Sequence, residues 1–141
     1  MNDEHFMKKA IWDAKHPDDK HFGAIVVKDN RIIARSGKKL LYNPTGHAET
    51  QAIVKACKKL KTKNLAGCIL YSTCEPCPMC FYVAWRTNIS KIVYGATIQD
   101  AEQHGFPQIK VSDRFLNKRG DERIKLKEKI LRNECLKVFA G

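Results

Sequence analysis

The sequence predicts an α/β fold, a three-layer α/β/α sandwich in which helices cover both faces of a partly parallel sheet. Segments with the hydrophobic spacing of helices alternate along the chain with short runs typical of strands, and such alternation favours strands connected by helices. The chain has 141 residues, of which 43% are hydrophobic and 29% charged, values typical of a folded globular protein. We therefore expect a single domain that spans residues 1–141 and buries its own core.

The N-terminal third of the chain predicts a helix followed by a hairpin. Apolar side chains recur at helical spacing over residues 3–15. Residues 22–28 and 32–36 are rich in β-branched side chains and are expected to form strands. The dipeptide Asp29-Asn30 between them favours a tight hairpin turn.

The middle of the chain alternates between helix and strand. Thr45 or Gly46 is expected to open a second helix, whose buried stripe consists of Ala52, Ile53, Ala56, Cys57 and Leu60. Residues 68–72 predict a buried strand, and a turn over residues 73–78 leads into a helix from Cys77 to about Arg86. Residues 91–95 predict a further strand.

The C-terminal third gives weaker patterns. A short helix or loop is expected over residues 99–106, and residues 108–111 are expected to form an edge strand. Apolar residues between 121 and 138 predict one terminal helix, with Ile124, Ile130, Leu131, Cys135 and Val138 as its buried positions.

Cysteine usage points to a metal site rather than to disulfide bonds. Three of the six cysteines lie between residues 74 and 80, while Cys57, Cys68 and Cys135 stand among apolar neighbours and are expected to belong to the core. The N-terminus lacks the apolar stretch of a secretory signal, and no apolar run is long enough to cross a bilayer. We therefore expect a cytoplasmic protein without a membrane partner.

The residues with the clearest chemistry are His47, Cys77 and Cys80, each expected near the start of a helix. Two cysteines three residues apart on a first helical turn can direct both sulfurs at one ion, and a histidine at another helix start can supply a third ligand. Three protein ligands leave one position of tetrahedral Zn²⁺ open, which is typical of catalytic sites. The spacing therefore predicts one catalytic zinc ion per chain. Cys74 would extend the run toward an iron–sulfur pattern, but the fourth nearby cysteine of such a cluster is missing.

Glu49 is the predicted catalytic residue. It stands two positions beyond His47, close enough to reach an activated water without binding the metal. A carboxylate there can take a proton from water and deliver it to a ring nitrogen and then to a departing amine. His-x-Glu followed by Pro-Cys-x-x-Cys is typical of zinc nucleobase deaminases.

The formal net charge of +11 raises the alternative of a nucleic-acid partner. Basic residues cluster, however, in two stretches that we interpret as largely helical: residues 55–63, which contain five lysines, and residues 114–132. Runs of this kind are typical of a solvated helix face. We therefore expect a small-molecule base or nucleoside as substrate and keep nucleic acid as the alternative partner.

These motifs resemble the cytidine deaminase-like superfamily, and within it the branch of guanine deaminases and tRNA adenosine deaminases. The resemblance covers about residues 22–106 and is carried by Phe22-Gly23-Ala24, Asn43-Pro44-Thr45-Gly46-His47-Ala48-Glu49, the segment from Leu70 to Cys80, and Ile92-Val93-Tyr94-Gly95-Ala96. It implies a five-stranded mixed sheet between helices, usually assembled as a homodimer or a larger oligomer.

The resemblance also implies roles for individual residues. His47, Cys77 and Cys80 would bind zinc, and Glu49 would move protons. The Ala48 backbone N–H would hydrogen-bond the substrate near its reacting carbon, and Phe22 would help to line the base pocket.

Three departures separate this chain from the guanine deaminases that the zinc-binding segment resembles more closely. One is Tyr82-Val83, which stands where a pair of small residues commonly follows the last zinc cysteine. Gly37-Lys38-Lys39 replaces the segment that carries the purine-binding asparagine, and Pro107 and Gln108 follow Gly105-Phe106 where an acidic residue is expected. The prediction is therefore zinc-dependent hydrolytic deamination of an exocyclic amino group on a small nitrogen heterocycle. The alternatives are a tRNA or other nucleic-acid adenosine or cytidine deaminase, and a zinc-bearing binding module without turnover.

Overall fold

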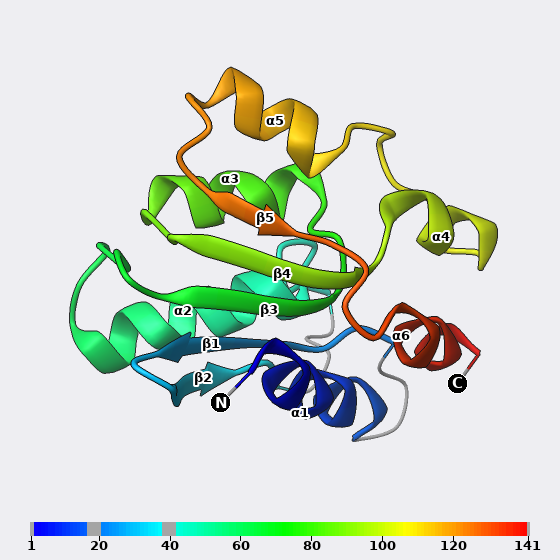
Figure 1. Ribbon diagram of the computed structural model, residues 1–141, viewed down its shortest axis with the longest axis horizontal. Coiled ribbons are helices and arrows are strands. Elements are labelled where there is room, and N and C mark those ends of the chain that lie inside the picture. The colour runs from blue at the N-terminus through cyan, green and yellow to red at the C-terminus, as the bar shows by residue number, and fades with distance from the viewer. Residues whose placement is uncertain (1, 17–20, 38–41, 141) are drawn as a thin grey trace.

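The computed structural model describes residues 2–16, 21–37 and 42–140 (Figure 1). Its helices are α1 (Asp3–Lys15), α2 (Ala48–Leu60), α3 (Pro78–Arg86), α4 (Ile98–Gln103), α5 (Asp113–Arg119) and α6 (Arg132–Phe139), and its strands are β1 (Ala24–Lys28), β2 (Arg31–Arg35), β3 (Ile69–Cys74), β4 (Lys91–Ala96) and β5 (Lys125–Lys127). Within these described ranges the strands form one sheet of five in the order β2-β1-β3-β4-β5. Strand β1 is antiparallel to β2 and β3, whereas β3, β4 and β5 are parallel, so the predicted mixed-sheet α/β fold is confirmed.

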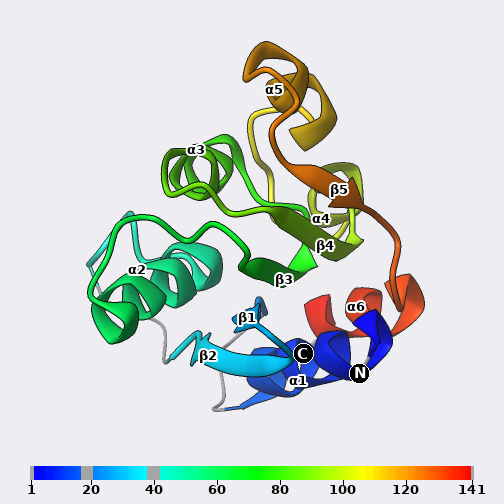
Figure 2. The same ribbon diagram turned by 60° about the vertical axis from the view of Figure 1, so that its left-hand side comes forward.

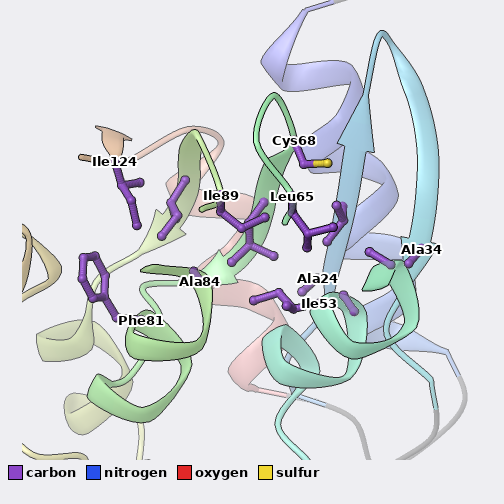
Figure 3. Close-up of a cluster of buried hydrophobic side chains, with 14 of the residues drawn as sticks. Ala24, Ala34, Ile53, Leu65, Cys68, Phe81, Ala84, Ile89 and Ile124 are labelled. Atoms are coloured by element: carbon purple, nitrogen blue, oxygen red, sulfur yellow. The ribbon is translucent and has the colours of Figure 1, made fainter. Parts of the chain in front are cut away.

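Helices cover both faces of the sheet, α2 and α3 on one face and α1 and α6 on the other (Figure 2). Successive side chains of a strand point to opposite faces. Val26, Leu70 and Ile92 are therefore buried against α2 and α3, in the cluster that Figure 3 shows. Their sequence neighbours, such as Ile25 and Val93, are buried against α1 and α6. The uninterrupted apolar runs of the strands thus serve two cores, one on each side of the sheet.

The hairpin and the first helix follow the sequence closely. Asp29 and Asn30 both have positive φ, 49° and 61°, as the tight turn between β1 and β2 requires. Helix α1 spans Asp3–Lys15, and the Asn2 side chain accepts a hydrogen bond from the backbone N–H of His5. This side chain caps the helix start.

The second helix begins later than predicted. Helix α2 starts at Ala48 with His47 as its N-cap, not at Thr45 or Gly46, because Asn43 closes a turn by accepting the backbone N–H and the hydroxyl of Thr45. The predicted stripe is buried at Ala52, Ile53 and Ala56, whereas Cys57 and Leu60 are only half-buried. The lysines of α2 are exposed, as predicted.

The C-terminal predictions were wrong in two places. Residues 108–111 form no strand, and the chain instead enters α5 at Asp113. The terminal helix predicted over residues 121–138 is only α6, because positive φ values at Asp121, Glu122, Lys129 and Leu131 break the helical path. Between these breaks lies β5, which pairs in parallel with β4.

The predicted core cysteines are buried at Cys68 and Cys135 and half-buried at Cys57. All six cysteines are free. Along the described stretches of chain, none of the helices has the length and hydropathy that crossing a membrane requires.

Asp113, at the start of α5, carries an unusual buried carboxyl group. The residue is fully buried, and neither carboxylate oxygen has a hydrogen-bond partner among the described residues. Burial raises the pKa of Asp113 well above its ordinary value, and the nearby charges of Glu75 and Glu49 raise it further. The folded protein therefore keeps a proton that the unfolded chain releases above about pH 4.

We predict that Asp113→Asn is more stable relative to wild type at pH 8 than at pH 5. Above about pH 4, Asp113 is protonated to a greater extent in the folded protein than in the unfolded chain, so the free energy of unfolding of the wild type falls as the pH rises. Asparagine does not titrate and removes this dependence. Each unit by which the pKa is raised corresponds to about 1.4 kcal/mol at a pH above both values. Urea unfolding of both proteins at the two pH values measures the difference. A difference that stays constant or shrinks toward pH 8 would show that Asp113 is ionised in the fold.

Candidate metal and active site

The structure brings together the three predicted metal ligands. His47 is the N-cap of α2, and Cys77 is the N-cap of α3. Cys80 lies three residues after Cys77, on the first turn of α3. The Nδ1 atom of His47 lies 3.5 Å from the Sγ atom of Cys77 and 3.5 Å from that of Cys80. All three donor atoms lie within 4.8 Å of one another, and among the described residues these three form the one such group of potential metal ligands.

This donor set fits zinc in chemistry and in spacing. One imidazole and two thiolates are typical ligands of Zn²⁺. Tetrahedral coordination with bonds of about 2.3 Å to sulfur and about 2.1 Å to nitrogen separates the nitrogen from each sulfur by about 3.6 Å. The observed 3.5 Å separations match this value. The residues can therefore hold a zinc ion without rearrangement of the two helix starts.

Electrostatics at the two helix starts favour a thiolate. The neighbouring Cys80 thiol and the His47 ring, whose Nδ1 lies 3.5 Å from the Cys77 sulfur, hold the pKa of Cys77 well below its ordinary value. The N-terminal end of α3 also favours negative charge at its first turn. Cys80 is buried, and its sulfur lies 3.2 Å from the hydroxyl of Thr50 on α2.

Cys74 lies outside this group. Its buried side chain lies at the end of β3, with its sulfur 3.8 Å from the carbonyl oxygen of Thr97. Burial raises the pKa of its thiol well above the ordinary value, so the side chain is an unreactive core thiol. The arrangement therefore gives no support to the iron–sulfur alternative.

Glu49 lies in the first turn of α2 and is 4% exposed. Its Oε1 atom lies 2.8 Å from the hydroxyl of Ser72 on β3, and that hydroxyl lies 2.6 Å from the carbonyl oxygen of Cys74. Burial raises the pKa of Glu49 above its ordinary value.

The Ser72 hydroxyl can satisfy both protonation states of Glu49. It donates its single proton to an ionised Glu49. When Glu49 is protonated, it accepts from the carboxyl group and donates to Cys74 instead. The sequence pattern did not predict this role for Ser72. A polar residue within a buried strand, on the side that faces α2, was the signal that could have indicated it.

A pocket of about 260 Å³ opens beside His47, Glu49 and Cys77. Phe22 and Phe106 line it, with their ring centroids 5.3 Å apart in an edge-to-face contact. Phe22 also contacts Phe139 and packs against both cores, so it is a pocket residue and a core residue at once. The volume lies just below the usual range of about 300–1,000 Å³ for ligand pockets and suits one small ring system.

The remaining pocket wall is polar. The Gln51 side chain connects the segment after β2 to the segment before α2. It accepts a hydrogen bond from the Gly37 N–H and donates one to the Gly46 carbonyl oxygen, each at 2.9 Å. Ala48 also lines the pocket, and as the first residue of α2 it has an N–H without an acceptor inside the helix. His21 and Gln108 complete the wall. Lys38 and Lys39, which the sequence places after Gly37, lie outside the described residues.

Comparison with known proteins agrees with this geometry. Residues 1–96 match the cytidine and deoxycytidylate deaminase zinc-binding region. A tRNA-specific adenosine deaminase from Aquifex aeolicus is 43% identical over 101 residues, which cover 68% of this chain and 67% of the relative. A guanine deaminase from Bacillus subtilis is 39% identical over 128 residues, which cover 86% of this chain and 79% of the relative.

A solved structure from a study of A-to-I editing by tRNA:A34 deaminases superposes with a TM-score of 0.77 at 30% identity. The superposition covers 95% of this chain and 98% of the other. The matched family region contains the three potential metal ligands His47, Cys77 and Cys80, and it also contains Glu49, which lines the pocket beside His47 and Cys77. The chain therefore belongs to the cytidine and deoxycytidylate deaminase family and is a zinc-dependent deaminase.

Proposed function

We propose that the protein removes the exocyclic amino group of a free base or nucleoside at the pocket bounded by Phe22 and Phe106. His47, Cys77 and Cys80 hold one zinc ion, and Glu49 moves the protons. The observation that supports this best is the placement of a buried carboxyl group, Glu49, in the pocket that the metal ligands His47 and Cys77 also line, with Cys80 buried in the same group of ligands. A structural zinc site has no use for such a group.

The chain's own residues supply binding and proton transfer. A bound zinc ion supplies the Lewis acidity that makes water nucleophilic near neutral pH. Glu49 takes one proton from the attacking water and delivers it to a ring nitrogen as the oxygen adds to the amino-bearing carbon. Glu49 then takes the second proton from the added hydroxyl and gives it to the amino group. The C–N bond breaks, ammonia leaves, and the carbon keeps the oxygen. Ser72 holds the Glu49 carboxyl group in place through both states. The Ala48 N–H donates to the heterocycle beside its reacting carbon.

Relatives of two kinds match the chain, so the size of the substrate is the main question. The pocket admits one ring system, free or flipped out of a polynucleotide. The zinc-binding segment from Cys74 to Cys80 resembles that of the guanine deaminases, and the lysines of α2 lie on its exposed face. These observations favour a small molecule. The charge of +11 supports the second candidate, a tRNA deaminase.

Turnover of monomers and of tRNA at two salt concentrations separates these candidates. We expect ammonia release from a free base or nucleoside that changes little between about 50 and 200 mM salt. Binding through several phosphates would instead weaken steeply over that range. Strong turnover of tRNA that collapses with salt, with none on any monomer, would reject the small-molecule proposal.

We predict that Phe22→Leu raises KM at least about fivefold while kcat changes less. An aromatic face stacked on a base contributes about 1–3 kcal/mol, and leucine replaces only part of this. Because Phe22 also packs in the core, the melting temperature falls too. Phe139→Leu is the matched control, since Phe139 contacts Phe22 but does not line the pocket. If both variants lower the melting temperature and neither changes KM, Phe22 acts only in the core.

We also propose that the protein is a single cooperatively folding domain, a homodimer and cytoplasmic. The six free cysteines suit a reducing compartment, and homodimers are usual in the superfamily that the chain resembles. Light scattering coupled to size-exclusion chromatography determines the subunit count. Calorimetry with one unfolding transition would support the single domain.

A further inference from the structure

Gln108 has an unsatisfied polar atom at the edge of the pocket. The residue follows α4 in the loop 104–112, lines the pocket and is half-buried. Its Oε1 atom is shielded from solvent and has no hydrogen-bond partner within the described ranges. A buried acceptor without a donor costs about 1–3 kcal/mol, so some compensating role is expected for it.

The surroundings of Gln108 suggest what that role is. Its close neighbour Phe106 forms one aromatic wall of the pocket, in contact with Phe22 and with His21. Aromatic rings of this kind pack against flat ring systems. The terminal torsion of a glutamine side chain is soft, so the carboxamide can turn its oxygen toward a molecule in the pocket.

The neutrality of the Gln108 side chain matters as much as its position. Where an acid is expected from the resemblance to guanine deaminases, this chain has a neutral amide. A carboxamide can accept and donate hydrogen bonds but cannot exchange a proton near neutral pH. Gln108 is therefore suited to recognising a ring and not to moving protons, which leaves the proton transfers to Glu49.

We propose that Gln108 determines substrate specificity: its Oε1 accepts an N–H of the heterocycle, away from the carbon that loses the amino group. The substrate class is then a flat aminoheterocycle that carries a second N–H donor, such as a ring lactam N–H. This inference rests on the proposed function. It adds that the ligand-free protein holds an acceptor whose donor arrives with the substrate.

The test uses the zinc-loaded protein, the variant Gln108→Leu, the acceptor-retaining variant Gln108→Glu, and Gln103→Leu as the matched control. Gln103 is exposed on the last turn of α4. Calorimetric titration with 8-azaguanine, a guanine analogue with several N–H donors, gives Kd, and thermal unfolding without ligand gives the melting temperature. We expect Gln108→Leu to weaken binding about 3- to 10-fold, as for loss of one neutral hydrogen bond. Gln108→Glu stays within about threefold of wild type, because a carboxyl oxygen still accepts.

The ligand-free melting temperature separates recognition from a structural role. Leucine removes the unpaired acceptor, so Gln108→Leu should melt at the same temperature as wild type or higher. A lower melting temperature with unchanged Kd would overturn the inference. So would equal affinities of Gln108→Leu and Gln103→Leu.

Failure of the proposed function would look different. Wild-type protein that neither binds 8-azaguanine nor releases ammonia from any base or nucleoside would reject both proposals. If it deaminates another heterocycle without binding 8-azaguanine, the KM of that heterocycle replaces Kd. An unchanged KM in Gln108→Leu then rejects the inference alone.

Discussion

Replacing Glu49 with alanine is expected to reduce turnover by at least about 10³-fold while the protein keeps its zinc and its fold. General acid–base groups contribute about 10²–10⁴-fold, and this carboxyl group serves the attacking water, the ring nitrogen and the departing amine. No other acidic side chain lines the pocket among the residues that the structure describes. The measurement is kcat for ammonia release together with zinc content and melting temperature.

The matched control is Glu4→Ala, because Glu4 is exposed in the first turn of α1, just as Glu49 lies in the first turn of α2. The control should retain the activity of the wild type. Activity of Glu49→Ala within about threefold of wild type, with zinc retained, would remove Glu49 from the mechanism. Loss of zinc in that variant would instead make Glu49 a support of the metal site.

Replacing Cys77 with serine is expected to lower the zinc content from about one ion per chain to near zero after dialysis. The serine hydroxyl remains protonated near neutral pH, whereas the Cys77 thiol ionises readily because of its neighbours Cys80 and His47. Loss of one of three protein ligands also removes the geometry that a tetrahedral site requires. Catalysis should be lost along with the metal.

Cys57→Ser is the matched control, since Cys57 is half-buried on the last turns of α2 and lies outside the group of metal ligands. Elemental analysis of wild type and both variants, prepared in parallel, gives the comparison. Full zinc content in Cys77→Ser would exclude Cys77 as a ligand. Visible absorbance of an iron–sulfur cluster in the wild type would exclude zinc as the resident metal.

The metal site could be predicted from the sequence because its geometry is local. Cys77 and Cys80 lie on one helical turn, and His47 and Glu49 lie on another. The contact between the two turns is fixed by the packing of α2 and α3 on the same face of the sheet. The roles of Ser72 and Gln51 depend on contacts across 23 and 14 residues, which spacing alone does not reveal.

The C-terminal third could not be predicted because its backbone departs from the local pattern. The backbone has positive φ at Asp121, Glu122, Lys129 and Leu131. Residues other than glycine rarely adopt this conformation. Tertiary contacts stabilise this path: Asn117 donates to the carbonyl oxygen of Ile124 and accepts its N–H, and β5 pairs with β4. These contacts override the apolar spacing that had predicted one long helix.

The most direct test of the proposed reaction is ammonia release from a set of heterocycles by the same protein with and without zinc. The set contains guanine, adenine, cytosine, their nucleosides and aminotriazines. We expect the zinc-loaded protein to release one ammonia per molecule of oxygenated product from at least one of them. Activity should disappear on removal of the metal by a chelator and return on addition of about one equivalent of zinc. Zinc-loaded, folded protein that releases no ammonia from any of these compounds or from tRNA would contradict the account and favour a zinc-bearing binding module without turnover.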